Sequence, residues 1–591
     1  MHTNLRSFIQ VLQKEKEIIE VTAPVDPVLE LAEIQRRVVE AQGPALLFTR
    51  VKGSNFPVVT NLFGTQRRLE LAIGSRPEII VKKALAALER LMSPKLGVLW
   101  QERDWLLDLL RCGVKKVNPR KAPVLECCQR KEQVDLGQLP ALVSWPEDGG
   151  RFITLPLVYT EHPVTGQHNL GMYRAQIFSA NQTGMHWQIH KGGGFHYYEA
   201  EQQGQSLPLT LFLGGPPALT MAAIAALPEM IPELIFASFL MGDKVKQVEV
   251  AEHAHALIAE TEFALCGEVP PKLRRPEGPF GDHYGYYSVV HDFPVFQVQT
   301  VYHRRDAIYP ATVVGKPRQE DYYIGDYFQS LLSPLFPVVM PGVRALWTYA
   351  ETGFHSLAAA VVRESYYREA LAHAFRILGE GQLSLTKILL VTDVSCDLSR
   401  FVDLLEVLLQ RFQPERDLLI INDTAMDTLD YTGRKFNQGS KAIITGLGAP
   451  VRRLPQEYQG GLFPGISKIK PFCRGCLLLS GNSFDQHPQL AEELVPLVQE
   501  PLAEWPLVIL VDEVDRIYDQ TSFLWTVFTR FDPALDIYAV KIVKHNKLVY
   551  QGPILIDARM KPPYPGELFP QEDIVKRVSK RWNELFGNDQ A

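Results

Sequence analysis

The chain has 591 residues, of which 46% are hydrophobic and 22% are charged, and these values are typical of a globular protein. Its length predicts about three or four domains. The formal net charge of −6 argues against the basic surface that nucleic-acid-binding proteins need, so we expect no DNA or RNA partner.

Signals for export or membrane insertion are not predicted. The N-terminal residues carry a charged run at 14–17 and no apolar core followed by small residues, so we expect no secretory signal. The most apolar region, residues 207–242, is interrupted by prolines and glutamates, which argues against a transmembrane helix of about twenty residues. Seven cysteines, few and odd in number, fit a reducing compartment. We therefore predict a cytoplasmic protein.

Cys473 and Cys476 have the C-x-x-C spacing of a zinc knuckle or a redox dithiol. No second C-x-x-C pair or H-x-x-x-H pair follows to complete a tetrahedral site. The pattern favours ordinary thiols and leaves the role of the segment around Cys473 open.

Residues 1–125 alternate helical and strand patterns, which predicts an N-terminal α/β domain. Ser75 is the expected cap of its third helix, and Pro77 suits the first turn. The basic stretch 115–123, with two prolines, is expected to be a linker. The predicted helices cover residues 5–16, 27–40 and 77–92, and the predicted strands cover 45–49 and 57–60.

Residues 126–330 contain many short strand patterns punctuated by Gly and Pro. This predicts a split β-barrel domain of the flavin-reductase type, and the mouths of such barrels accept flat ligands such as flavins. The predicted strands cover 155–160, 209–213, 245–250, 260–264 and 295–303, and one helix is predicted at 217–227.

Within this domain, two short runs at 169–174 and 184–190 flank a polar turn cluster at 179–184, which predicts a β-hairpin. Strict alternation along the second run would place His186, Gln188 and His190 on one face. Trp187 and Ile189 would then lie on the other face. The predicted hairpin therefore carries a row of potential ligands backed by an apolar surface.

Residues 331–565 return to α/β order and contain an internal repeat. A strand ending at Asp393 and a helix ending at Asp417 are matched by a strand ending at Asp512 and a helix ending at Asp536. Both pairs are offset by 119 residues, since 512 − 393 = 119 and 536 − 417 = 119. We therefore predict two copies of one strand-helix-strand unit.

The remaining residues, 566–591, contain an expected amphipathic helix. Its apolar stripe must be buried, and packing on its own domain and docking on another subunit are equally supported. The stripe consists of Ile574, Val575, Val578, Trp582 and Leu585. The whole chain is thus predicted to be a multidomain protein of α+β and α/β architecture.

Three polar residues of the barrel region, Asn169, His190 and Glu233, are candidate ligands of a hard cation such as Mn²⁺ or Mg²⁺. From residue type alone, a purely structural role is the commoner alternative for each. Arg174 could bind a carboxylate through two parallel hydrogen bonds. Strand parity would place Arg174 and Asn169 on opposite faces, unless Gly171 forms a bulge.

A second cluster lies in the loop Pro276–Tyr287, where three glycines and Pro279 predict a tight turn. The loop carries Glu277, Asp282 and His283 among aromatic residues. Acids buried beside apolar rings tend to have a raised pKa, which would make one of them a proton donor near neutral pH. Acids that only cap or pair locally in a Gly-rich turn are an equally supported alternative.

These motifs together resemble the UbiD family of prenylated-flavin-dependent decarboxylases, and the likeness covers most of the chain from about residue 140. The shared motifs are Asn169-x-x-x-Tyr173-Arg174, His190-Lys-Gly-Gly, the stretch 228–233, Glu277-Gly-Pro-Phe-Gly-Asp282-His-x-Gly-Tyr, Arg305–Tyr309, Thr424–Tyr431 and Gly439–Lys441.

The resemblance implies a site made of three groups of residues. A Mn²⁺ ion, with K⁺ as a further candidate ion, would be held by Asn169, His190 and Glu233. Prenylated FMN would be contacted by Met172, Tyr173, Arg174, His186, Trp187, Gln188, Lys191 and Gly192. The catalytic residues would be Arg174, Glu277 and Asp282, the last being glutamate in some relatives.

The implied reaction is the non-oxidative decarboxylation of an aromatic or α,β-unsaturated acid. Loss of CO₂ leaves a carbanion at an sp² carbon, which needs a covalent electron sink of the kind the modified flavin provides. Arg174 would orient the carboxylate, Glu277 would hold Arg174, and Asp282 would deliver a proton. The partners implied are a flavin prenyltransferase, which supplies the cofactor, and further copies of the chain in a dimer or higher homo-oligomer.

The extended length resembles the branch that acts on naphthoate precursors of menaquinone made through futalosine. Decarboxylation of 4-hydroxy-3-polyprenylbenzoate in ubiquinone biosynthesis is the alternative. Functions of another kind are an FMN-dependent reductase or a non-catalytic flavin-binding scaffold. Two features depart from the family: the repeat copy near 500–565 with the Cys473 segment is an addition to the compact members, and Phe375-Arg376 replaces a lysine after His373-Ala374.

Overall fold

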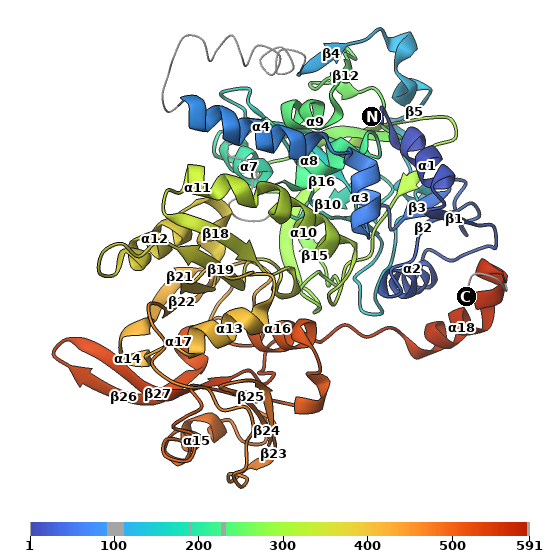
Figure 1. Ribbon diagram of the computed structural model, residues 1–591. Helices are drawn as coiled ribbons and strands as arrows, with labels where there is room; N and C mark the ends of the chain where they lie inside the picture. The colour runs from blue at the N-terminus through green and yellow to red at the C-terminus, as the bar shows by residue number, and fades with distance from the viewer. Residues whose placement is uncertain (1, 92–111, 188–191, 226–231, 588–591) are drawn as a thin grey trace. The chain divides into compact units, whose positions relative to one another are not determined.

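The computed structural model describes residues 2–91, 112–187, 192–225 and 232–587 (Figure 1). The chain forms two compact units, one made of residues 1–331 and 567–591 and the other of residues 332–566. A multidomain mixed α/β fold is therefore confirmed. The finer boundary expected at 125/126 stays a prediction.

A four-stranded sheet near the N-terminus takes its last strand from much later in the chain. Strand β17 pairs in parallel with β3, so Tyr309 lies opposite Val58. In spatial order the strands are β1 (Ile18–Val21), β2 (Ala45–Phe48), β3 (Val58–Thr60) and β17 (Tyr309–Pro310). The helices of this region are α1 (Leu5–Lys14), α2 (Glu30–Glu40), α3 (Gln66–Ile73) and α4 (Arg76–Leu91). The bounds of α1, α2, α4, β2 and β3 lie within a few residues of the predicted ones, whereas α3, β1 and β17 were not predicted.

Local capping explains where the first helix begins. The side chain of Asn4 accepts a hydrogen bond from the Ser7 backbone N–H at 2.9 Å, and the Ser7 hydroxyl donates back to the Asn4 carbonyl at 2.8 Å. Such a cap satisfies N–H groups that the first turn of a helix leaves unpaired. The buried residues Leu5, Phe8, Ile9 and Leu12 then form one face of α1.

The largest sheet of the first unit has ten strands and is open. Along its path the order is β6 (Phe152–Ile153), β9 (Ala175–Ser179), β10 (Gln182–Gly184), β16 (His291–His303), β14 (Phe263–Val269), β11 (Leu207–Leu213), β7 (Leu157–Glu161) and β8 (His168–Gly171). Strands β5 (Cys127–Arg130) and β15 (Arg274–Glu277) pair with β16 off this path. Within the described residues β6 and β8 do not pair with each other, so the sheet curls without closing.

A small sheet and four helices complete this region. The sheet contains β13 (Leu257–Ile258), β12 (Val245–Val248) and β4 (Val114–Lys116). The helices are α7 (Gly192–Gln202), α8 (Pro217–Ile224), α9 (Glu233–Met241) and α10 (Glu320–Leu332). The predicted strand at 260–264 is wrong in its bounds, because the ladder between β14 and β16 begins at Phe263.

The predicted hairpin is also only partly right. Strands β9 and β10 do form an antiparallel pair, but β10 begins at Gln182, inside the expected turn cluster. Asn169 lies on β8, which pairs with β7 instead. Met185, His186 and Trp187 follow β10 without strand pairing, so strict alternation does not describe them. Gln188, Ile189 and His190 lie outside the described residues.

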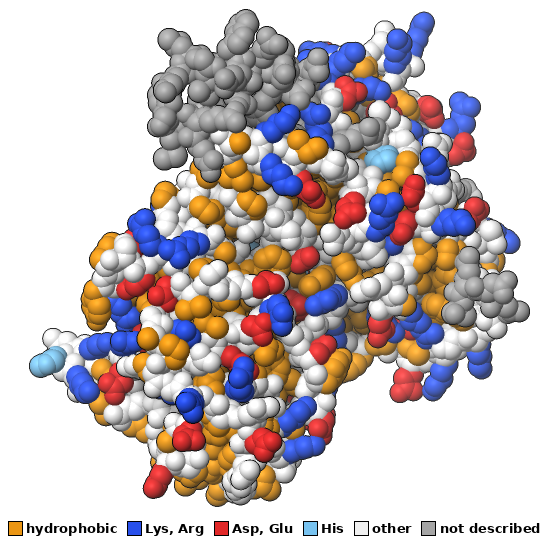
Figure 2. Space-filling view, viewed as in Figure 1, with side chains coloured by type: hydrophobic (Ala, Val, Ile, Leu, Met, Phe, Trp, Pro, Cys, Tyr) orange, Lys and Arg blue, Asp and Glu red, His pale blue; other side chains and the backbone are white. Residues whose placement is uncertain are grey.

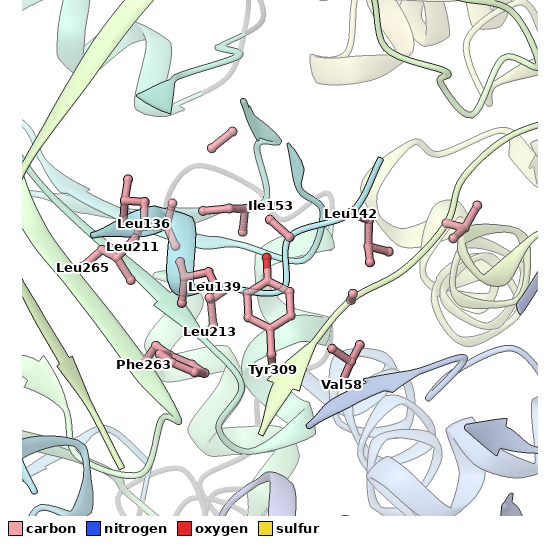
Figure 3. Packing of buried hydrophobic residues seen from close by; sticks show 14 of the residues in the cluster. Val58, Leu136, Leu139, Leu142, Ile153, Leu211, Leu213, Phe263, Leu265 and Tyr309 are labelled. Atoms are coloured by element: carbon pink, nitrogen blue, oxygen red, sulfur yellow. The ribbon is translucent and has the colours of Figure 1, made fainter. Parts of the chain in front are cut away.

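One hydrophobic core joins the N-terminal sheet and the ten-stranded sheet of the first unit (Figure 3). Tyr309, fully buried on β17, lies between residues of the N-terminal sheet and residues of the ten-stranded sheet. Phe56 packs edge-on against Phe263 with ring centroids 5.0 Å apart. The residues labelled in Figure 3 are Val58, Leu136, Leu139, Leu142, Ile153, Leu211, Leu213, Phe263, Leu265 and Tyr309. Segments on both sides of residue 125 thus share a core.

The terminal helix α18 (Glu572–Phe586) packs on α2 of the same chain, as Figure 1 shows. Ile574, Val578 and Leu585 of the predicted stripe are buried, while Val575 and Trp582 are half-buried. Arg581 of α18 forms an ion pair with the fully buried Glu30 at 2.5 Å. Of the two alternatives, packing within the chain is therefore the one observed.

The second unit contains two five-stranded sheets with the same strand order and directions. The first sheet has β18 (Val343–Thr348), β19 (Leu357–Val362), β20 (Ile388–Thr392), β22 (Gln438–Gly446) and β21 (Leu418–Ala425). The second has β23 (Ile466–Cys473), β24 (Cys476–Gly481), β25 (Leu507–Val511), β27 (Lys547–Asp557) and β26 (Ile537–Lys544). The repeat is therefore larger than predicted, because it includes all five strands.

The helices of this unit repeat as well. They are α11 (Phe336–Val339), α12 (Glu369–Leu378), α13 (Phe401–Leu409) and α14 (Pro414–Asp417) in the first copy, and α15 (Leu490–Val498), α16 (Gln520–Phe528) and α17 (Pro533–Asp536) in the second. The offset of 119 holds for the starts of α13 and α16 and of α14 and α17, since 520 − 401 = 119 and 533 − 414 = 119.

The two copies pack with reciprocal contacts. Helix α14 of the first copy contacts β27 of the second, and α17 of the second contacts β22 of the first. The Phe401 backbone N–H donates to Gln520 Oε1 at 2.8 Å, and these two residues are equivalents in the repeat. A residue that meets its own equivalent marks a local twofold axis, as in an isologous dimer.

Cys473 and Cys476 owe their spacing to a hairpin turn. Cys473 ends β23, Cys476 begins β24, and the two lie opposite each other across a two-residue turn. All seven cysteines are free thiols. No group of three or more His, Cys, Asp or Glu residues that could hold a metal occurs among the described residues. Ordinary thiols in the C-x-x-C pair stay a prediction.

On the face shown in Figure 2, basic and acidic side chains are interspersed over both units. Within the described ranges, no helix combines the length and the apolar character that crossing a bilayer requires.

Phe523 offers a test of the contact between the two repeat copies. Its ring is fully buried, stacks on Phe472 at 3.6 Å and lies 5.8 Å from Phe401. We expect Phe523→Ala to lower the opening free energy of α13 and α16 by about 3–5 kcal/mol, because it removes a core ring and leaves a cavity. Hydrogen exchange of peptides from these helices measures the change, with α18 peptides as an internal reference.

The matched control is Phe375→Ala, since Phe375 of the same unit is 51% exposed. It should change the opening free energy of these helices, measured by hydrogen exchange, by less than about 0.5 kcal/mol. Equal effects of the two variants would contradict the packing role assigned to Phe523.

Candidate active site

Arg174 lies at the centre of a buried polar cluster in the first unit. The chain leaves β8 after Gly171 and re-enters a strand at Ala175, so Arg174 sits in the bend between β8 and β9. Arg174 is therefore not on the same strand as Asn169, and the alternation of side chains along a strand does not determine which faces the two residues occupy. A bend takes the place of the bulge considered for Gly171, whose missing side chain makes room for the Tyr173 ring.

Two carboxylates hold the Arg174 guanidinium from different sides. Arg174 Nε donates to Glu277 Oε1 at 2.9 Å, and Nη1 forms an ion pair with Asp282 Oδ2. Nη2 donates to the Ser288 hydroxyl at 3.0 Å, and the guanidinium carbon lies 4.5 Å from the centre of the Phe280 ring. The structure thus brings together the three residues predicted to be catalytic.

The expectation of a raised carboxyl pKa in this loop is wrong for both acids in the structure. Burial alone raises the pKa of Glu277, but the charges of Arg174 and His186 outweigh it and lower the pKa to about 2. Burial also raises the pKa of Asp282, and Arg174 and His283 lower it well below its usual value. The reason is that the loop meets a cation 103 residues away in the chain, since 277 − 174 = 103.

Backbone contacts fix the acidic loop in place. Gly278 and Gly285 have φ values of +99° and +81°, which non-glycine residues rarely adopt. A side chain at Gly281 would come within 2.1 Å of the Trp145 ring, so this position needs glycine for close packing. The loop can therefore place Glu277 and Asp282 on the same guanidinium.

Asp148 and Gln176 support this loop and were missed in the sequence. Asp148 accepts hydrogen bonds from the backbone N–H groups of Gly281, Ser144 and Trp145, all at 2.8–2.9 Å. Gln176 Oε1 accepts from the Gly278 N–H at 2.8 Å. Burial raises the pKa of Asp148 to about 6 despite its three donors. Gln176 follows Arg174 by two residues, and this spacing was the one sequence feature that could have pointed to Gln176 as part of the site.

His186 and Trp187, both predicted to contact the cofactor, carry unsatisfied polar atoms. His186 Nδ1 is hydrogen-bonded to Glu277 Oε2 at 3.0 Å, whereas His186 Nε2 and Trp187 Nε1 are buried and have no hydrogen-bond partner among the residues that the structure describes. Leaving a buried polar group unpaired costs about 1–3 kcal/mol, so these atoms fit a site that receives a polar ligand. Gln188 and Lys191, predicted for the same role, lie outside the described residues.

Tyr173 and the start of α7 lie beside these residues. The Gly193 N–H donates to the Tyr173 hydroxyl at 3.4 Å, and a side chain at Gly193 would come within 2.7 Å of Trp187 Nε1. A side chain at Gly192 would come within 2.3 Å of Asn169 Oδ1. The glycines that begin α7 therefore let the helix approach Tyr173, Trp187 and Asn169. Met172 precedes Tyr173 in the same bend.

Two of the three predicted metal ligands are neighbours. Glu233 begins α9, and its Oε2 accepts from the backbone N–H of Leu170, the residue after Asn169. Burial raises the pKa of the Glu233 carboxyl. Asn169 Nδ2 lies 3.4 Å from the Tyr173 hydroxyl. His190, the third predicted ligand, lies outside the described residues. The amide and carboxylate oxygens present fit a hard cation.

The pH dependence of stability tests the electrostatic description of Glu277. Its pKa is lowered from 4.5 to about 2, so the carboxylate contributes stability that is complete above about pH 4.5 and lost as the pH falls toward 2. We expect Glu277→Gln to cost about 3 kcal/mol at pH 7, because a buried charge loses a partner. The difference in unfolding free energy between wild type and variant should shrink below pH 4.5.

Chemical denaturation at a series of pH values measures this difference. Glu132→Gln, at an exposed position, is the control and should show no such trend. A difference that stays constant through pH 3 would contradict the lowered pKa.

Comparisons with known proteins agree with this geometry. Three family models match the chain: the N-terminal domain of 3-octaprenyl-4-hydroxybenzoate carboxy-lyase at residues 9–88, its Rift-related domain at 115–317 and its C-terminal domain at 322–446. A Chlamydia pneumoniae protein, named as one of the subunits of 4-hydroxybenzoate decarboxylase, is 51% identical over 590 residues, which cover 99% of both chains. An uncharacterised Archaeoglobus fulgidus protein is 38% identical over 75% of this chain and 91% of its own length.

Solved structures give the same result. Vanillic acid decarboxylase of Sedimentibacter hydroxybenzoicus in its closed form has a TM-score of 0.67 at 24% identity, covering 78% of this chain and 96% of its own. The UbiD-class enzyme HmfF of Pelotomaculum thermopropionicum, solved with FMN, has a TM-score of 0.63 at 25% identity, covering 78% and 98%. The chain therefore belongs to the UbiD family of decarboxylases, which are carboxy-lyases.

Proposed function

We propose that the protein removes CO₂ from an aromatic or α,β-unsaturated carboxylic acid with prenylated FMN as its cofactor. The observation that carries this proposal is the buried cluster in which Glu277 and Asp282 hold Arg174. A guanidinium is the group best suited to bind a substrate carboxylate, and a carboxyl group beside it can supply a proton. The reductase and scaffold alternatives find no support in the matched family.

The cofactor proposal rests on unsatisfied atoms and on relatives. Within the described part of the chain, His186 Nε2 and Trp187 Nε1 are buried without partners, and the glycines that begin α7 leave helix N–H groups suited to a phosphate. One solved relative is described in complex with FMN and another form of it in complex with prenylated FMN. When bound, the modified flavin supplies a covalent sink for the electrons of the bond to CO₂. A flavin prenyltransferase would supply it.

We assign the phosphate end of this site a Mn²⁺ ion held by Asn169, His190 and Glu233, with K⁺ as a further candidate ion. Oxygen ligands and one imidazole suit Mn²⁺, and a dication beside a phosphate offsets its charge. The buried Glu233 carboxylate beside Leu170 supports this assignment, because a cation there would compensate a charge that burial disfavours.

Arg174 links substrate binding to proton delivery. A substrate carboxylate that approaches Arg174 competes with Asp282 for the same positive charge. Glu277 keeps the guanidinium in place from the Nε side during this exchange. As Arg174 turns part of its interaction to the substrate, the pKa of Asp282 rises, because Arg174 is the principal cation that lowers it. Asp282 can then protonate the carbon that lost CO₂.

Two substrate classes follow from different observations. The extended length favours a naphthoate precursor of menaquinone, through the branch that the chain resembles. The name of the Chlamydia pneumoniae relative and the vanillic acid decarboxylase structure favour a hydroxybenzoate, with the polyprenylated acid of ubiquinone biosynthesis as one member of that class. A homo-oligomer is also proposed; one relative, HmfF, has been solved in an evolved dimeric form. A cytoplasmic location stays a prediction.

The direct test is CO₂ release by protein co-expressed with a flavin prenyltransferase. We expect release from one class among naphthoates, hydroxybenzoates and polyprenylated hydroxybenzoates, with Asp282→Asn slowing product formation by about 10²–10⁴-fold because it removes the proton donor. Mass spectrometry of the bound flavin checks that the variant keeps its cofactor. Asp292→Asn, at an exposed position of β16, is the control. Full activity of Asp282→Asn with intact cofactor would remove Asp282 from the mechanism.

Metal analysis tests the proposed ion independently of turnover. Glu233→Gln should lower bound Mn²⁺ and bound flavin together, because it replaces an anionic ligand with a neutral one. Elemental analysis and flavin absorbance of the purified protein give both quantities. Glu249→Gln, whose side chain is 66% exposed, should leave both unchanged. Unchanged Mn²⁺ in Glu233→Gln would contradict the assignment.

A further inference from the structure

Asp282 has a second partner that the proposed reaction does not yet use. Its Oδ2 meets Arg174, while its Oδ1 is bonded to His283 Nδ1 at 2.7 Å and to the His283 backbone N–H at 2.7 Å. The carboxylate therefore bridges a guanidinium on one side and an imidazole on the other. Because the two contacts use different oxygens, Arg174 and His283 can act on Asp282 separately.

His283 lies between the buried acid and water. The side chains of Glu277, Arg174 and Asp282 are 0%, 7% and 10% exposed, whereas that of His283 is 28% exposed. Decarboxylation consumes one proton for each CO₂ released, and that proton must come from solvent. A buried acid that gives up its proton in every turnover needs a route by which to regain it.

We propose that His283 is a proton relay that recharges Asp282 after each turnover; the proposal rests on the decarboxylase function assigned above. The protonated imidazole transfers the proton on Nδ1 to Asp282 Oδ1, which leaves a neutral imidazole and a carboxylic acid. Asp282 then gives its proton to the carbon that lost CO₂ and returns to a carboxylate. The imidazole regains one proton from water, so each cycle takes up one proton per CO₂.

The charges around His283 suit this role. Asp282 faces the ring from its own loop, and Asp321 of α10 interacts electrostatically with both His283 and Asp282. These two carboxylates favour the charged imidazole. Arg174 and His186 are the cationic groups that act on Asp282 from the other side. The Tyr284 ring packs edge-on against His283 at 5.3 Å and fixes its position.

A purely positioning role for His283 makes a different prediction. In that case an asparagine, whose amide can donate the same hydrogen bond to Asp282, would preserve activity. In the relay, asparagine fails because an amide does not exchange protons near neutral pH. We expect His283→Asn to lower kcat by about 10–100-fold with KM unchanged, and imidazole buffer to restore part of the loss by carrying the proton instead.

His253→Asn is the control, because His253 also lies near the carboxylate of the preceding residue, Glu252, at 4.0 Å. Its kcat should equal that of the wild type. An unchanged kcat in His283→Asn, or a loss that imidazole does not reduce, would overturn the relay. If the wild type releases no CO₂ from any acid tested, the proposed function itself fails.

A second measurement needs neither cofactor nor turnover. Nitrogen NMR of the apo protein labelled at histidine follows the titration of His283, assigned by its loss in His283→Asn. Asp282→Asn should lower the pKa of His283, because it removes the adjacent negative charge. Asp292→Asn should leave it in place. If Asp282→Asn leaves the pKa of His283 unchanged, the two groups do not share a proton, whatever the outcome of the activity assays.

Discussion

The acidic loop of the first unit is held by one permanently charged side chain that lies away from water. Arg174 is 9% exposed and cannot lose its proton, so its burial is tolerated only because carboxylates meet it. Two carboxylates face this one guanidinium, and they contact different nitrogens of it. A substrate carboxylate would add a further negative charge, which favours proton uptake when an acid binds.

The support for this cluster comes from segments that are distant in the sequence. The acidic loop is fixed by Asp148 from one segment, by Gln176 from β9 and by the fit of Gly281 against Trp145. None of these residues touches the carboxylates themselves. They hold the backbone that carries Glu277 and Asp282. Both carboxylates must reach the same guanidinium, so a small displacement of this backbone would break one of the contacts. The rigidity of the loop is therefore needed to keep both carboxylates on Arg174.

The sequence predicted the cluster but not its electrostatics. The resemblance of short motifs to the UbiD family joined Arg174, Glu277 and Asp282 into one network, whereas residue type and spacing alone left local capping or pairing of the two acids equally supported. The sign of the carboxyl pKa shifts was wrong, because burial could be guessed from neighbouring aromatics whereas the distance to Arg174 could not. Asp148 was missed since its three donors come together only in the folded chain. The prediction that Arg174 and Asn169 lie on opposite faces of one strand does not apply, because the strand ends at Gly171.

The repeat in the second unit was found from two aspartate pairs, but its full extent was not. Strands β18, β19, β23 and β24 lie before those pairs and share little sequence pattern beyond hydrophobicity. Their equivalence follows from pairing order, which depends on contacts between segments far apart in the chain. The local sequence pattern therefore predicted helices of the repeat but missed some of the strands of its two sheets.

The local twofold axis at Phe401 and Gln520 has an evolutionary consequence. In an assembly of identical chains every substitution at such an axis occurs twice, once on each side. Here the two sides are encoded separately, so either can change alone, and their association does not weaken on dilution. The copies have diverged accordingly: the first connects β21 to β22 through a long loop with buried Asp427 and Asp430, and the second turns directly from Lys544 to Lys547.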